Sequence, residues 1–116
     1  MIERAFARAF NARNIGALVT LLAPDARSEL AGSGFPPEEG AGAIRGGSFE
    51  HLLEDEGLTA APLEHDGTSY VAFHAEDGSL DSLAALTAID GVITQLRYHT
   101  RWHDEAFVDA IADATA

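Results

Sequence analysis

The sequence lacks cysteine and lysine and is poor in positive charge. Without cysteine, the chain can form no disulfide, no thiolate metal site and no cysteine nucleophile. Seven basic residues stand against nineteen acidic ones, which gives a formal net charge of -12. Because proteins bind phosphate backbones through clustered Lys and Arg, this balance excludes nucleic acid as an expected partner.

Long hydrophobic runs are also absent. No apolar stretch approaches the roughly 18 residues that a membrane-spanning helix requires, and no basic-then-apolar signal opens the chain. With 116 residues, of which 47% are hydrophobic, we expect one globular domain over 1–116, a cytoplasmic location and no membrane partner. No motif indicates a metal or another cofactor. The spacing of His99 and His103 would suit one ion on a helix, but on a strand four residues span roughly 13 Å.

The first half of the chain is predicted to be mainly helical. The segment "IERAFARAFNA" repeats apolar residues at i, i+4 and i+8, which indicates an amphipathic helix. Asn14 can cap a second helix, and Pro24 ends it. A short strand over 26–31 and a third helix over 43–54 follow, with a loop rich in Gly and Pro between them.

The second half has the pattern of an antiparallel sheet. Three Asp-Gly pairs, each a strong hairpin signal, separate four β-like runs over 58–65, 68–76, 80–89 and 92–102. The tail "DEAFVDAIADA" has helical spacing. This order predicts an α+β domain with helices on one face of a curved sheet.

This order, with "AFNARNIGALVTLLAPDA" near the start and "IDGVITQLRYH" near the end, resembles the nuclear transport factor 2-like superfamily. That group includes ketosteroid isomerases, SnoaL-like polyketide cyclases and scytalone dehydratase. The resemblance implies a cone-shaped, curved antiparallel sheet wrapped around the N-terminal helices, as in the cystatin-like or ketosteroid isomerase-like α+β barrel. It also implies a ligand pocket on the concave side and, often, pairing of two subunits through the convex side.

The family comparison assigns alternate residues of three strands to the pocket. The inward set is Ser28, Leu30, Tyr70, Ala72, His74, Gln95, Arg97, His99 and Arg101. The set expected on the convex face is Val71, Phe73, Leu96, Tyr98 and Trp102. Periodicity alone favours the opposite, with the apolar set as the core, and a solvated Arg/His face stays open as the alternative.

Two histidines are the best candidates for proton transfer. Imidazole acts as acid or base near neutral pH, so His74 and His99 could serve as a catalytic pair. With Tyr70 they loosely resemble the histidine site of scytalone dehydratase, but no matching pocket aspartate is evident. The alternative is that these histidines are only hydrogen-bonded.

Two arginines indicate an anionic ligand. Guanidinium recognises carboxylates well, so Arg97 and Arg101 would bind a small organic acid if they face the pocket. SnoaL-like members frequently carry an aspartate where this chain has Arg101, which argues against a proton-abstracting cyclase. Pairing with Glu29, Asp104 or Glu105 is an equally good explanation.

Two functional classes therefore stay open. The first is a non-catalytic small-molecule-binding domain, with Phe6 of the first helix among the ligand-binding residues. The second is an enzyme of the lyase, isomerase or cyclase type that uses the histidine pair on a small organic acid. A homodimer is expected, because the apolar convex set is too large to leave in water.

The resemblance also yields a negative prediction. Phe6, Leu30 and Ala85 occupy the positions of the oxyanion-hole tyrosine, the general base and the protonated aspartate of ketosteroid isomerases. None of these side chains donates to an enolate or carries a proton. The protein should therefore not isomerise a β,γ-unsaturated ketosteroid above background in a spectrophotometric assay, and measurable turnover would show that the alignment is wrong.

Overall fold

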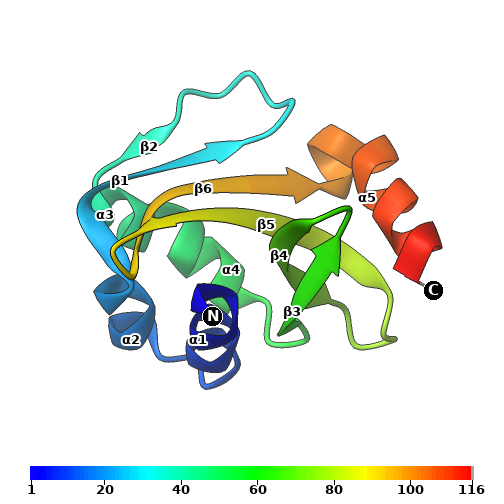
Figure 1. Ribbon diagram of the computed structural model, residues 1–116, viewed down its shortest axis with the longest axis horizontal. Coiled ribbons are helices and arrows are strands. Elements are labelled where there is room, and N and C mark those ends of the chain that lie inside the picture. Colours follow the sequence, from blue (N-terminus) through cyan, green and yellow to red (C-terminus); the bar gives the residue numbers. More distant parts are fainter. Residues whose placement is uncertain (116) are drawn as a thin grey trace.

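The computed structural model describes residues 1–115 as one curled, six-stranded sheet with helices on both faces (Figure 1). The elements in chain order are α1 (Ile2–Asn11), α2 (Ile15–Thr20), β1 (Leu22–Leu30), β2 (Glu38–Glu39), α3 (Ala41–Ile44), the π-helix η1 (Arg45–Phe49), α4 (Glu50–Glu54), β3 (Thr59–His65), β4 (Thr68–His74), β5 (Leu80–Ile89), β6 (Val92–Thr100) and α5 (Arg101–Thr115).

The strand order across the sheet is β2-β1-β6-β5-β4-β3. Strands β3 to β6 form the predicted antiparallel meander. Strand β1 lies beside β6 and runs parallel to it, so the sheet is mixed. The N-terminal helices occupy the hollow of the sheet, which confirms the predicted α+β cone (Figure 1).

Two of the three Asp-Gly pairs form the predicted hairpin turns. Asp66-Gly67 and Asp90-Gly91 have positive φ at both residues, as a type I′ turn requires. At the third pair only Gly78 has positive φ, at 86°. There the Asp77 carboxylate instead accepts hydrogen bonds from the backbone N–H and the hydroxyl of Ser79.

Three boundaries differ from the sequence prediction. Strand β1 begins at Leu22 rather than 26, and Pro24 falls where the pairing with β6 shifts register, a place where a strand tolerates a missing N–H. The third helix contains a π-helical segment at Gly46 and Gly47. Helix α5 starts at Arg101, directly after β6, with a non-helical kink at Asp104.

The concave face of the sheet packs on a cluster of phenylalanines. Phe6 and Phe10 of α1, Phe49 of η1 and Phe73 of β4 are all 0% exposed. Phe6 meets Phe49 and Phe73 edge-on, with ring centroids 5.8 and 6.3 Å apart, and Phe10 meets Phe73 at 5.1 Å. Leu96 of β6 belongs to the same core.

The strand orientation predicted for β4 and β6 is wrong. Val71, Phe73, Leu96 and Tyr98 lie in the concave core and not on the convex face, while Trp102 beyond the strand is 91% exposed. The convex face of these strands carries a second cluster, in which α5 packs over the sheet. Its buried members are Tyr70, Ala72, Leu80, Leu83, Val108 and Ile111.

This orientation also removes the argument for a homodimer through an apolar convex face. Most of the residues expected on the convex face are buried in the core of the chain itself, and α5 covers part of the convex face.

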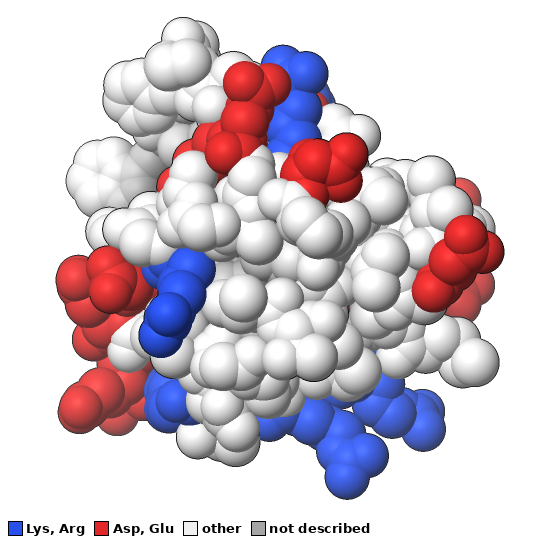
Figure 2. Space-filling model, turned by 90° about the vertical axis from the view of Figure 1, so that its left-hand side faces the viewer, with Lys and Arg blue, Asp and Glu red and all other residues white. Residues whose placement is uncertain are grey.

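The side of the molecule that carries α2, α3 and the start of β1 is uncharged at its centre, with acidic side chains and arginines around it (Figure 2). Within 1–115, no helix is both long and apolar enough to cross a membrane.

Two neighbouring residues of β6 test the orientation. Leu96 is fully buried in the core and Arg97 is exposed. Leu96→Ala should lower the free energy of unfolding by about 2–5 kcal/mol, because it leaves a cavity. Arg97→Ala should lower it by no more than about 1 kcal/mol, since it removes an exposed ion pair. Urea denaturation measures both, and equal effects would contradict the register.

Candidate functional site

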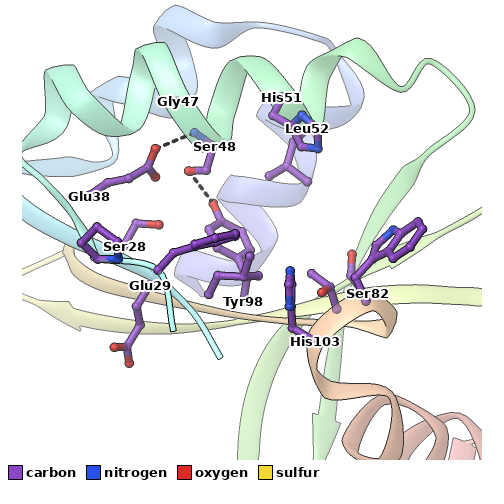
Figure 3. Close-up of a pocket in the computed structure, with 15 residues that line it drawn as sticks. Ser28, Glu29, Glu38, Gly47, Ser48, His51, Leu52, Ser82, Tyr98 and His103 are labelled. Carbon is purple, nitrogen blue, oxygen red and sulfur yellow. Dashed lines mark hydrogen bonds between the residues drawn. The ribbon is translucent and has the colours of Figure 1, made fainter. Parts of the chain in front are cut away.

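A cavity of about 460 Å³ lies on the concave side, between the β1–β6–β5 part of the sheet and the η1–α4 segment (Figure 3). Its wall combines apolar groups with a few polar ones. The sheet contributes Ser28, Glu29, Leu30, Ser82, Tyr98 and Thr100; the loop after β1 and strand β2 contribute Phe35, Pro36 and Glu38; the helical segments contribute Gly47, Ser48, His51, Leu52, Trp102 and His103.

Strand pairing explains why the sheet residues meet. Leu30 of β1 lies opposite Tyr98 of β6 in the parallel pair, and Ser82 of β5 lies opposite Thr100 in the antiparallel pair. Residues opposite each other project from the same face of a sheet. The buried Ser28, two residues before Leu30, shares that face. The hydroxyl of Thr100 is buried and has no hydrogen-bond partner.

Glu38 brings a carboxylate to this cavity. Its Oε2 accepts a hydrogen bond from the backbone N–H of Ser48 at 2.9 Å, while its Oε1 is buried and has no partner among the residues that the structure describes. Gly47 makes room for the carboxylate, because a Cβ at that position would overlap Oε2. The π-helical segment therefore donates one N–H to Glu38, and the absence of a side chain at Gly47 leaves space for the carboxylate. Such segments are frequent at functional sites.

Tyr98 lies beside Glu38, and both converge on Ser48 (Figure 3). The Tyr98 and Ser48 hydroxyl oxygens are 3.5 Å apart. Burial strongly raises the pKa of Tyr98, because the phenolate would lose its hydration, and the negative charge of Glu38 raises it further. Tyr98 therefore keeps its proton at neutral pH, and the hydroxyl can donate a hydrogen bond to a ligand.

Aromatic side chains surround the mouth of the cavity. Phe35 is 64% exposed and Trp102 is 91% exposed, both unusual for such large apolar groups. The Phe35 ring meets the His103 ring edge-on at 5.7 Å. His51 of α4 lies on the opposite wall (Figure 3). No group of three potential metal ligands occurs among residues 1–115.

The two arginines predicted to face the pocket do not line it. Arg97 forms an ion pair with Glu29. Arg101 forms one with Asp109 of α5, and it also donates to the Leu80 carbonyl at 3.0 Å. Internal pairing, the alternative left open by the sequence, is what the structure shows. Because side chains alternate between the two faces of β6, Arg97 points away from the concave side.

The histidine pair is not assembled in the cavity either. His99 is buried beneath α5, where its Nδ1 lies 2.7 Å from an Asp104 oxygen and its ring stacks on Phe107 at 4.0 Å. Tyr70 meets that histidine edge-on. His74 ends β4, half-buried, and the cavity wall includes neither histidine.

The remaining predicted residues divide between core, surface and cavity. Phe6 lies in the phenylalanine core, and Gln95 pairs across to Arg27 and Thr87 without reaching the cavity wall. Ser28 and Leu30 do line the cavity, although their role in binding stays a prediction.

Sequence reasoning missed the most polar part of the site. Glu38, Ser48 and Tyr98 were not assigned to the pocket. The one available signal is in "FPPEEGAGAIRGG", where acidic residues follow a loop and precede adjacent glycines. Adjacent glycines in a helix weaken it, so they indicate that something approaches the backbone closely.

Comparisons with known proteins identify the fold. No family model and no curated protein sequence matches this chain. Among solved structures, a putative polyketide cyclase from Sinorhizobium meliloti is 24% identical with a TM-score of 0.61, over 82% of this chain and 90% of that one. An NTF-2-like protein of unknown function from Burkholderia xenovorans is 13% identical with a TM-score of 0.65, over 83% and 77%. A computationally designed 17-OHP binder is 19% identical with a TM-score of 0.62, over 82% and 84%.

The chain therefore has the nuclear transport factor 2-like fold, as the sequence resemblance implied.

Two adjacent glycines test the placement of Glu38. A Cβ at Gly46 would meet nothing within 4 Å, whereas one at Gly47 would overlap the Glu38 carboxylate. Gly46→Ala should stabilise the protein by up to about 1 kcal/mol through helix propensity. Gly47→Ala gains the same propensity but displaces Glu38 from the Ser48 N–H, which costs about 1.5–3 kcal/mol. Thermal unfolding should separate the two variants, and equal stabilities would contradict this position of Glu38.

Proposed function

We propose that this protein binds a small, mostly apolar molecule in the concave cavity and holds it through a few hydrogen bonds. The observation that carries the proposal is a cavity of about 460 Å³ lined by Glu38 and Thr100, each of which has a buried side-chain oxygen without a hydrogen-bond partner among residues 1–115. Buried polar atoms are normally hydrogen-bonded, so two of them at one cavity indicate that a partner belongs there. This size and this mixture of apolar wall and few polar groups are typical of ligand sites.

Two structural neighbours support the proposal by analogy. One is described as a 17-OHP binder and another as a putative polyketide cyclase. Fold alone does not fix function, so the weight rests on the cavity. All of its walls come from one chain, and the proposal does not require the homodimer. Whether the protein dimerises stays a prediction that sedimentation equilibrium can test.

A second candidate is an acid–base enzyme that uses the same cavity. It is favoured by Glu38, a carboxylate that could accept a proton, near Tyr98, a protonated phenol that could donate a hydrogen bond to a developing oxyanion. This pair replaces the histidine pair that the sequence suggested. The two functions differ in the fate of the ligand, so NMR spectra of a bound compound, followed over hours with catalytic amounts of protein, distinguish turnover from binding.

Filling the cavity tests the proposed function. Leu52 lines the cavity, and Leu53, the next residue, does not, although both are half-buried and pack against the core. We expect a thermal-shift screen of small aromatic alcohols, ketones and amines to find compounds that raise the melting temperature. Leu52→Trp should abolish that shift and Leu53→Trp should keep it. A shift that survives Leu52→Trp would place the ligand elsewhere, and a screen without any shift would contradict the proposal.

A further inference from the structure

We infer that the cavity prefers an organic cation, an amine carried on an apolar body, to the organic acid that the sequence suggested. This inference rests on the proposed function and names the chemical class of its ligand. Three independent properties of the wall support it: its charge, its hydrogen-bonding character and the aromatic groups at its mouth.

Charge in the cavity comes from one carboxylate. Glu38 is directed toward Ser48 and Tyr98, whereas the Glu29 carboxylate points away from them and pairs with Arg97 (Figure 3). No arginine within 1–115 lines the cavity, and the chain contains no lysine. A carboxylate ligand would therefore meet like charge, while a cation would meet a charge of opposite sign.

The unpartnered acceptor oxygens of the lining residues also favour a ligand that donates hydrogen bonds. A carboxylate only accepts, and the Ser48 N–H already occupies Oε2. Oε1 is buried without a partner, so a small rotation of the carboxylate would offer it to a donor in the cavity. An ammonium group has three donors. One of these donors would be enough for Glu38 Oε1.

Aromatic rings in the cavity lining are the third property that favours a cation. Trp102 and Phe35 belong to the cavity lining and are largely exposed, and indole and phenyl faces attract cations. The net charge of -12 adds a field that raises the local concentration of cations around the whole molecule. An alcohol of the same shape would gain one hydrogen bond but neither of these electrostatic contributions.

Three compounds with one ring system test the inference. 1-Naphthylmethylamine, 1-naphthalenemethanol and 1-naphthoate carry a cationic, a neutral and an anionic polar group at pH 7. Isothermal titration calorimetry should rank them in that order. The amine should bind about ten- to a hundredfold more tightly than the carboxylate, as a charge-assisted hydrogen bond implies. Leu52→Trp should weaken whichever of them bind, which locates them in the cavity.

Two glutamates on the same short strand provide the matched variants. Glu38 lines the cavity and Glu39, its exposed neighbour, does not. Glu38→Gln should weaken binding of the amine about ten- to a hundredfold and so remove its preference over the alcohol. Glu39→Gln removes the same formal charge and should change neither affinity. An equal loss in both variants would mean that only the overall charge attracts the amine, which would overturn the inference.

The outcomes separate this inference from the proposed function. If the alcohol or 1-naphthoate binds as tightly as the amine, the cavity binds small molecules but the preference for a cation is wrong. If none of the three binds, the proposed function fails and the inference fails with it. Should Glu38→Gln not fold, the ranking of the three compounds with the unaltered protein decides.

Discussion

The register of β6 between β1 and β5 is the constraint on which both the core and the cavity depend. It places Leu96 among the helices and Tyr98 at the cavity, while Arg97 between them points outward. Because side chains alternate along a strand, a slip of one residue would exchange the faces. Arg97 would then enter the phenylalanine core without a partner, and an unpaired charge there is far costlier than an exposed leucine. The sequence of β6 therefore tolerates one register.

Helices cover both faces of the sheet, so orientation cannot be judged from burial alone. In β4 the four consecutive residues from Tyr70 to Phe73 are all buried, because α1 packs on one side and α5 on the other. Periodicity nevertheless favoured the correct orientation, with the apolar set in the core, and the family comparison led to the wrong one. The polar His99 is accommodated on the α5 side because Asp104 of that helix binds its ring.

Local features were predictable from the sequence, and contacts between distant segments were not. The turn at Asp90-Gly91 depends on two residues with positive φ, and the cap of α2 depends on Asn14, whose side chain accepts from Ala17 N–H at 3.0 Å. In contrast, Glu38 reaches the site only because β2 pairs with β1 and because η1 lies above it with Gly47. No pattern of residues close together in the sequence predicts this contact between β2 and η1. The family comparison assigned two of the strands to the wrong face.

The scarcity of positive charge in the sequence and the character of the cavity are connected. Arg13 donates to three backbone carbonyls between α4 and β3, at 2.7 to 3.2 Å, and so fixes that loop. Arg97 pairs with a carboxylate on β1, and Arg101, which pairs with Asp109 of its own helix, also donates to the Leu80 carbonyl of β5. These arginines thus connect segments of the chain, and with no lysine to supplement them the cavity wall receives no guanidinium or ammonium group. Among the described residues, Glu38 therefore has the Ser48 N–H and no cationic side chain as a partner, which is the basis of the proposed preference for a cation.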